Sequence, residues 1–278
     1  MTTGNEWQDK VGKAWAENFS RTDRALSGLT QHLLERLAPM PGETIVDIGC
    51  GAGELSLALA RGRPTATITG VDISADLVDA ARQRGQNLRN ASFLLADAAV
   101  WRPDGAPLDL LVSRHGVMFF PDPVMAFANL LGGAAKGANL LFSCFRDPAA
   151  NPWATEPMRL MEIPPSADPL APGPFAFADD ERVRSILTKA GWRDIVIDPV
   201  DFAFVMGMGD DPVAEALQFV SRIGPAATAL RGMDAVTREN ALGRLQGWFA
   251  RHRSGSGQQG GIVAFPAAGW LVSARKPG

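Results

Sequence analysis

VDIGCGAGEL, residues 46–55, places three glycines between an apolar run and a helical pattern. The run TIVDIG predicts a β-strand, and ELSLALARG predicts the helix that follows it. A glycine-rich turn at this junction lets the backbone approach a ligand closely and aims the N–H groups of the first helical turn at it. The stretch therefore predicts a ligand site at the carboxyl end of a strand.

Two ligand classes that use such turns fit poorly. The dinucleotide pattern G-x-G-x-x-G/A needs a third small residue, but the two possible registers place Glu54 or Ser56 there. A Walker loop needs Gly-Lys-Ser/Thr, which is absent. The acidic residues Asp47 and Glu54 would repel a pyrophosphate, so a cationic or zwitterionic ligand is favoured.

The wider pattern predicts an α/β fold with a doubly wound, mostly parallel, seven-stranded sheet. Apolar strands alternate with helices, as a parallel sheet covered on both faces requires. Residues 1–40 are predicted to form an N-terminal helical lid, and residues 41–146 the ligand-binding core. Residues 147–178 are rich in proline and predict a lid loop. Residues 179–278 complete the core, with a helical cap insertion at about 211–253.

Composition limits the partners. The net charge is −3 over 278 residues, and no lysine or arginine cluster indicates a nucleic-acid surface. No apolar run reaches the roughly 20 residues of a membrane span, and we expect a cytoplasmic protein without a membrane partner. Cys50, Cys144 and three scattered histidines show no metal-ligand spacing, so no metal site is expected. The sequence does not distinguish a monomer from a homodimer.

VDIGCGAG resembles the first motif of the class I S-adenosylmethionine-dependent methyltransferases. The stretches GVDIS, ADAA and LLVSRHGVMFF follow in the order of that family's later motifs. The tryptophan-containing N-terminal helix and the ending GWLVSARKP are similar to a bacterial small-molecule branch, the methyltransferase type 11/25-like proteins. The resemblance implies a Rossmann-like methyltransferase fold, S-adenosyl-L-methionine as cofactor and S-adenosyl-L-homocysteine as its product.

The resemblance also assigns cofactor-binding residues. In the glycine turn, those that would cradle the methionine part are Asp47, Gly49, Cys50 (through its backbone), Gly51 and Gly53.

Four residues, which lie at or just after the ends of the second and third predicted strands, would bind the nucleoside. Asp72 would accept hydrogen bonds from both ribose hydroxyls, and Ile73 would pack on the adenine. Asp97 would accept from the adenine amino group, with the backbone N–H of Ala98 near the ring. Carboxylates only accept hydrogen bonds, which suits a diol and an amine. The alternative is that Asp72 and Asp97 are helix caps or loop residues.

Arg114 and His115 end the fourth predicted strand, beside the expected methyl group. Arg114 would bind the cofactor's carboxylate or an acidic acceptor, and a salt bridge to Glu54 is the alternative. His115 is the candidate catalytic residue. It could remove a proton from a phenol or enol, because an unperturbed histidine titrates near pH ~6.5. The alternative is a histidine that only shapes the pocket or orients the cofactor.

The acceptor class follows from what the sequence lacks. Methyltransferases of DNA amino groups carry an Asn/Asp-Pro-Pro-aromatic stretch after the fourth strand, and cytosine C5 enzymes use a Pro-Cys nucleophile. Metal-dependent catechol-type enzymes place an aspartate at the end of the fourth strand, where this chain has Ser113, Arg114 and His115. We therefore expect a metal-independent methyltransferase that acts on a small, apolar or aromatic metabolite. The predicted acceptor contacts are Met118, Phe119, Trp153 and Met158, for each of which core packing is the alternative.

Two other functions stay open at this stage. The chain could be a non-catalytic regulatory or scaffold protein that retains the fold and the cofactor, or, with less support, an RNA methyltransferase. The sequence does not indicate which acceptor is used, or whether oxygen, nitrogen, carbon or sulfur is methylated.

Overall fold

The computed structural model describes residues 7–165, 168–255 and 260–278. Its sheet has the strand order β3-β2-β1-β4-β5-β8-β6, with a short β7 paired to β8. The strands are β1 (Thr44–Ile48), β2 (Thr67–Asp72), β3 (Ala91–Leu95), β4 (Leu108–Arg114), β5 (Ala134–Phe145), β6 (Arg193–Gly209), β7 (Arg253–Ser254) and β8 (Gly261–Arg275). The predicted doubly wound α/β fold is confirmed, and the two-residue β7 adds to the seven strands expected.

The first five strands are parallel, and β8 runs antiparallel between β5 and β6. The central strands β1 and β4 are buried on both faces, with Ile45, Val46, Leu110 and Leu111 fully enclosed. Helices on both sides of the sheet provide this burial, which is why the central strands read as continuous apolar runs.

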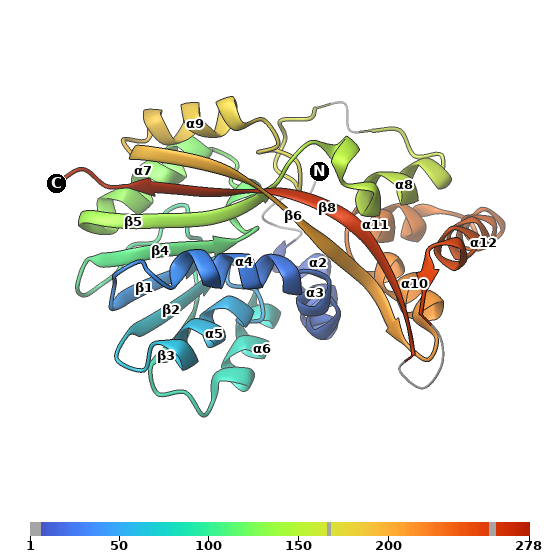
Figure 1. The fold of residues 1–278 in the computed structure, drawn as a ribbon, viewed down its shortest axis with the longest axis horizontal. Coiled ribbons are helices and arrows are strands. Elements are labelled where there is room, and N and C mark those ends of the chain that lie inside the picture. Colours follow the sequence, from blue (N-terminus) through green and yellow to red (C-terminus); the bar gives the residue numbers. More distant parts are fainter. Residues whose placement is uncertain (1–6, 166–167, 256–259) are drawn as a thin grey trace.

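Helices cover the two faces in separate groups (Figure 1). One face carries α4 (Ser27–Leu37), α5 (Glu54–Gly62) and α6 (Ala75–Gly85), and the other carries α7 (Pro123–Gly133) and α9 (Asp180–Lys189). The chain enters through α2 (Lys10–Glu17) and α3 (Phe19–Ala25). None of the helices in the described ranges is long and apolar enough to cross a membrane.

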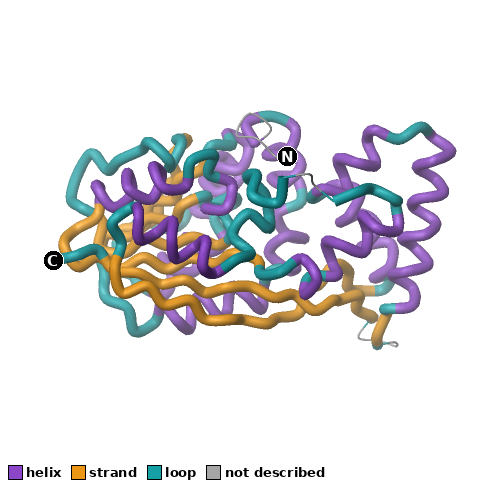
Figure 2. The backbone as a smooth tube through the Cα atoms, turned by 90° about the horizontal axis from the view of Figure 1, so that it is seen from above, coloured by secondary structure: helices purple, strands orange, loops and turns teal. Residues whose placement is uncertain are grey.

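β6 and β8 continue beyond the other strands and carry a helical group at one end of the molecule (Figures 1 and 2). This group contains α10 (Pro212–Arg222), α11 (Pro225–Gly232) and α12 (Ala235–Arg251). Asp211 and Asp234 cap the first and third of these helices, and Pro212 and Pro225 open the first two. The helices predicted within 211–253 are therefore confirmed.

The proline-rich segment is not only a loop. It contains the one-turn helix η2 (Pro148–Ala150) at its start and the longer α8 (Pro152–Leu160) after it, whereas the one-turn helix η1 (Val117–Phe119) lies earlier in the chain, after β4. Pro152 occupies the first turn of α8, where a missing N–H costs no helical hydrogen bond. The number of prolines predicted a loop, but a proline in the first turn of a helix, such as Pro152 in α8, is compatible with that helix.

Candidate active site

The carboxyl ends of β1 and β4 meet at the point where the strand order reverses. β1 lies between β2 and β4, so the chain leaves these two strands toward opposite faces. Open α/β sheets bind ligands in the crevice at such a switch point. The glycine turn follows β1 and His115 follows β4, so the two motifs singled out from the sequence lie in one crevice.

Two glycines allow these turns to touch. A Cβ placed on Gly49 would lie 2.8 Å from the Cα of Gly116, and one on Gly116 would lie 2.5 Å from the carbonyl oxygen of Ile48. Gly49 also has a φ of 64°, in the left-handed region that favours glycine. Gly49 is thus required by backbone packing as well as by its place at the ligand crevice, and sequence reasoning missed its partner Gly116.

The crevice opens into a cavity of about 250 Å³. Of the residues expected to bind the cofactor, those that line it are Asp47, Gly49, Cys50, Gly51, Asp72, Ile73, Asp97, Ala98 and Arg114. Gly53 does not line the cavity, contrary to expectation. It is the N-terminal capping position of α5, with φ 86°, and an added Cβ would meet Phe93 at 3.0 Å. Its role is to start the helix.

Asp47 has a polar atom that needs a ligand. The side chain is buried, and Ser56 Oγ donates to its Oδ2 at 2.6 Å. Among the described residues, Oδ1 has no hydrogen-bond partner. Burial raises the pKa of Asp47 to about 6, against the lowering effects of Ser56 and Arg114. A buried, unpartnered carboxylate oxygen on a cavity wall fits a cationic group such as the ammonium of an amino acid.

Asp72 joins the glycine turn to the second strand. Its Oδ2 accepts the N–H of Gly51 at 2.8 Å, and its Oδ1 accepts the N–H of Ser74 at 2.9 Å. Burial raises its pKa, while these N–H groups oppose the rise. Ser74, not Asp72, caps α6. Each carboxylate oxygen keeps capacity for another hydrogen bond, so Asp72 can also bind a diol.

Asp97 lies at the outer rim. Its Oδ1 accepts the N–H of Ala99 at 2.9 Å, and it lines the cavity beside Ile73 and Ala98. Asp97 is therefore a loop residue that accepts a hydrogen bond from its own turn. Its second carboxylate oxygen lies at the rim, where it would accept from the adenine amino group.

The salt bridge considered between Arg114 and Glu54 is not the one that forms. Arg114 donates to Asp23 at 2.9 Å and to Thr30 at 2.9 Å, whereas Glu54 pairs with Arg84 at 2.7 Å. Asp23 also contacts Arg84 at 3.0 Å. Asp23 lies within α3 and ties the N-terminal helices to both arginines of the core.

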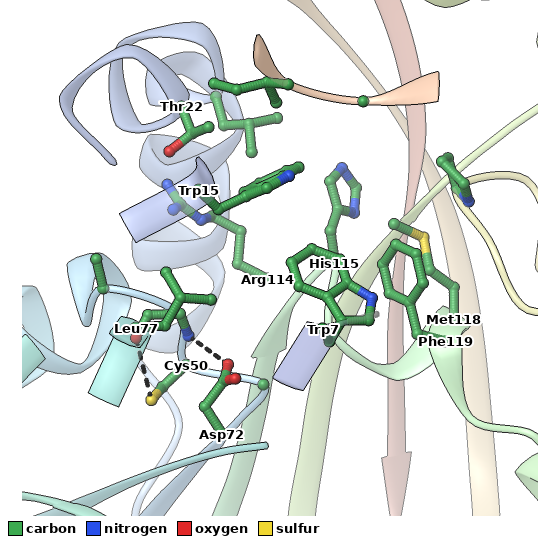
Figure 3. Close-up of a pocket in the computed structure, with 18 of the residues that line it drawn as sticks. Trp7, Trp15, Thr22, Cys50, Asp72, Leu77, Arg114, His115, Met118 and Phe119 are labelled. Atoms are coloured by element: carbon green, nitrogen blue, oxygen red, sulfur yellow. Dashed lines mark hydrogen bonds between the residues drawn. The ribbon is translucent and has the colours of Figure 1, made fainter. Parts of the chain in front are cut away.

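The N-terminal helices close the crevice (Figure 3). Trp7 packs edge-on against Trp15 at 5.3 Å and against Phe119 at 5.2 Å between ring centroids. A Cβ on Gly12 would lie 2.1 Å from Ser74 Oγ, so α2 rests directly on the start of α6. Trp7 and Trp15 both line the cavity. These tryptophans therefore fold over the ligand crevice as well as packing against neighbouring rings.

The apolar end of the cavity includes three of the four expected acceptor contacts, Met118, Phe119 and Trp153. Met158 does not line it and packs against the main core. On α8 the lining positions are Trp153, Ala154 and Pro157, and Met158 lies beyond the edge of that face. Sequence reasoning missed Phe145, Phe204 and Phe219, which come from three different elements and share no local motif.

His115 lies between the two ends of the cavity (Figure 3). Its φ is 61°, and its Nδ1 lies 3.2 Å from Ser143 Oγ. Nε2 is buried and has no partner among the described residues. Burial lowers the pKa of His115 to about 3, against the opposing effect of Ser143. The imidazole is therefore neutral near pH 7, and protonating it there is unfavourable.

Two further findings bear on the chemistry. Within the described ranges, no group of three or more His, Cys, Asp or Glu side chains could hold a metal ion. Burial raises the pKa of both Cys50 and Cys144, so neither thiol is an activated nucleophile.

Known proteins are similar to this chain in sequence and in fold. A family model described as a methyltransferase domain matches residues 45–133. The trans-aconitate 2-methyltransferase of Afipia carboxidovorans is 34% identical over 125 residues, which are 45% of this chain and 47% of that enzyme. That of Paracidovorax citrulli is 29% identical over 237 residues, 76% of this chain and 85% of that enzyme.

A solved structure with the same fold is Haemonchus contortus phosphoethanolamine N-methyltransferase 2 in complex with S-adenosyl-L-methionine. Its TM-score is 0.57 at 14% identity, covering all of this chain and 61% of that one. The chain spans about half the length of the Afipia enzyme. In its fold and its glycine turn the chain is similar to the class I S-adenosylmethionine-dependent methyltransferases, and residues 45–133 match a methyltransferase domain.

Proposed function

We propose that the protein transfers the methyl group of S-adenosyl-L-methionine to a small, apolar or aromatic metabolite without a metal ion. The observation that carries the proposal is the continuity of one cavity. One end has the unpartnered Asp47 oxygen and the Asp72 carboxylate, and the other end is built from aromatic and methionine side chains. This pairs a site for a zwitterionic nucleoside with a site for an apolar molecule.

The residues fit the cofactor group by group. Asp47 would bind the ammonium and Asp72 the ribose hydroxyls, while Asp97 and the Ala98 N–H would bind the adenine. Trp7 and Trp15 would exclude water above it. When bound, the cofactor supplies a methyl group on a sulfonium; an acceptor lone pair forms the new bond as the carbon–sulfur bond breaks and its electron pair stays on sulfur.

Metal independence is proposed from the end of β4. Ser113, at the position where a metal-dependent enzyme would need a carboxylate, is buried and donates to the carbonyl oxygen of Ile48 at 2.6 Å. This serine therefore supports the backbone between the two turns. Positioning and exclusion of water are then the main contributions that the chain makes to catalysis.

The alternative of a non-catalytic, cofactor-binding protein has less support. A regulatory protein needs no second pocket, yet the apolar end is enclosed by residues from β5, β6, α8 and α10. An RNA methyltransferase would need a basic surface around the cavity, and Arg114, the one lining cation among the described residues, is paired with Asp23.

Calorimetry on the purified protein with EDTA present tests the first half of the proposal. Both S-adenosylmethionine and S-adenosylhomocysteine should bind. Labelled S-adenosylmethionine and a metabolite extract then test the second half, and label should pass to a small organic molecule. Binding of a nicotinamide cofactor in place of either ligand would contradict the proposal. Cofactor binding without transfer to any fraction would favour the non-catalytic alternative.

A further inference from the structure

The apolar end of the cavity has one wall made of rings in contact, of which one pair is stacked and the others are tilted or edge-on. His115 lies 4.0 Å from Phe145, and Phe145 lies 4.9 Å from Trp153, between ring centroids. Trp153 stacks on Phe204 at 4.0 Å with an interplanar angle of 9°, and Phe204 meets Phe219 edge-on at 5.7 Å. All five line the cavity. We call this series, from His115 to Phe219, the aromatic wall.

The wall is fixed by residues behind it. Asn151 is fully buried; its Oδ1 accepts from Trp153 Nε1 at 3.0 Å and from the N–H of Ala268 at 3.0 Å. The polar atom of Trp153 is thereby satisfied away from the cavity, and only its ring faces the ligand. A wall of flat rings favours a flat, unsaturated ligand, because such a ligand can make offset-stacked or edge-to-face contacts with several of the rings.

Two side chains that line this end carry an unpartnered nitrogen that donates or can donate a hydrogen bond. Trp7 Nε1 and His115 Nε2 are both buried and unpartnered within the described part of the chain. An indole N–H can only donate. His115 Nε2 donates in the tautomer whose Nδ1 accepts from the Ser143 hydroxyl, 3.2 Å away. Unpaired donors in an apolar cavity call for a ligand with hydrogen-bond acceptors.

Positive charge is lacking at the same place. Arg114 is the only lysine or arginine among the described lining residues, and Asp23 neutralises it at 2.9 Å. A polycarboxylate would bring several negative charges into this apolar space with no free cation to pair them, which is costly. A single carboxylate differs, because the sulfonium of the bound cofactor supplies the opposite charge.

Resting on the proposed function, we propose that the acceptor is a flat, apolar monocarboxylic acid. Its ring system lies along the aromatic wall, and its carboxylate accepts from His115 Nε2–H and Trp7 Nε1–H. One carboxylate oxygen donates a lone pair to the methyl carbon, the carbon–sulfur bond breaks toward sulfur, and a methyl ester forms. The acid is already ionised at neutral pH, so no proton has to be removed. This agrees with a His115 imidazole too deeply buried to accept one.

The test uses defined probes with the wild-type protein. Benzoate, 2-naphthoate, anthracene-2-carboxylate, 2-naphthol and trans-aconitate are each offered with S-adenosylmethionine, and products are identified by mass spectrometry. At least one ring carboxylate should give its methyl ester, with kcat/KM at least roughly tenfold above that for trans-aconitate. Turnover of trans-aconitate or 2-naphthol in preference to all ring carboxylates would overturn the inference, as would failure of every ring carboxylate to react.

Variants test the two donors. His115→Phe and Trp7→Phe keep a ring but lose the N–H, and each should raise KM for the ring carboxylate by roughly 10- to 150-fold, the range for a hydrogen bond to a charged group. His115→Gln, which restores a donor, should recover part of the loss. His252→Phe is the matched control, because that histidine packs on Phe265 outside the cavity.

Affinity for S-adenosylhomocysteine separates this inference from the proposed function. It should fall much less than affinity for the acceptor in both donor variants, because each variant keeps a ring in the same place. If it falls as much as the acceptor's, the donors bind the cofactor and the inference is wrong while the proposed function stands. If the wild-type protein does not bind S-adenosylhomocysteine at all, the proposed function itself fails.

Discussion

Replacing Asp47 by asparagine should weaken cofactor binding strongly while making the free protein more stable. The substitution keeps the side chain's size and an oxygen for the Ser56 hydroxyl, which now donates at 2.6 Å. It removes the charge opposite the ammonium. A hydrogen bond between charged groups contributes about 1.5–3 kcal/mol, so the dissociation constant for S-adenosylhomocysteine should rise roughly 10- to 150-fold.

The stability change has the opposite sign. The pKa of Asp47 is about 6 in the folded protein, above its ordinary value of 3.8, so the folded state holds this proton more tightly than the unfolded state. The free energy of unfolding therefore falls as pH rises from 3.8 to 6, by on the order of 3 kcal/mol. The amide that replaces the carboxyl carries no charge, so D47N should unfold at a higher temperature than wild type at pH 7.5.

The same proton makes wild-type cofactor affinity depend on pH. Below pH 6 the carboxyl must lose a proton before it can pair with the ammonium, so affinity for S-adenosylhomocysteine should fall about tenfold from pH 7.5 to pH 5. Neighbouring charges at Arg114 and Asp72 act on Asp47 in opposite directions and are already included in its pKa. D47N should lack this pH dependence.

Calorimetry at the two pH values and a thermal melt measure all three effects. Asp79→Asn is the control, because Asp79 is an exposed residue paired with Arg82 on α6. An unchanged dissociation constant in D47N at pH 7.5 would refute the assignment of the ammonium to Asp47. A loss of affinity together with a lower melting temperature would mean that the variant acts through the fold.

Three further predictions concern other parts of the site. Asp72→Ala should weaken S-adenosylhomocysteine binding by about 1.5–3 kcal/mol in calorimetry. It should also lower the melting temperature, since the N–H groups of Gly51 and Ser74 lose their acceptor; unchanged affinity would mean that Asp72 does not bind the ribose. Gly12→Val should displace α2 from Ser74, raising the S-adenosylhomocysteine dissociation constant with little loss of core stability, and normal affinity would argue against a closing helix. With both substrates saturating, turnover should stay flat from pH 6 to pH 9, and a rise through the ordinary histidine range would restore His115 as a general base.

The cofactor end of the site could be predicted because its residues sit in local motifs. Strand, glycine turn and helix are consecutive in sequence, so Asp47 and Gly51 are placed by the pattern that forms the turn itself. Asp72 and Asp97 end neighbouring parallel strands, whose carboxyl ends must meet at one edge of the sheet. What the motif did not show was that Asp72 also holds the turn.

The acceptor end could not be predicted in the same way. These side chains (Phe145, Trp153, Phe204 and Phe219) meet only because β6 and β8 extend past the other strands and α8 packs against β8. Nothing in a strand's alternating pattern indicates which inward-facing aromatic residue lines a cavity and which fills the core. Met158 was misplaced for that reason.

The ion pairs of the site and the pKa of His115 could not be predicted from the sequence either. Glu54 was the partner considered for Arg114, but Arg114 pairs with Asp23 of α3, which is 91 residues away in the sequence. The pKa of His115 also depends on burial by distant elements. The residue type alone suggests a pKa near neutral pH, but burial in the folded protein lowers the pKa of His115.

A crystal structure of the protein with S-adenosylhomocysteine would test the central claim most directly. The account predicts the ribose hydroxyls on Asp72, the ammonium on Asp47 Oδ1, and the thioether sulfur directed toward the apolar end beside His115. A ligand bound outside the glycine turn, or one whose sulfur points away from the aromatic wall, would contradict it.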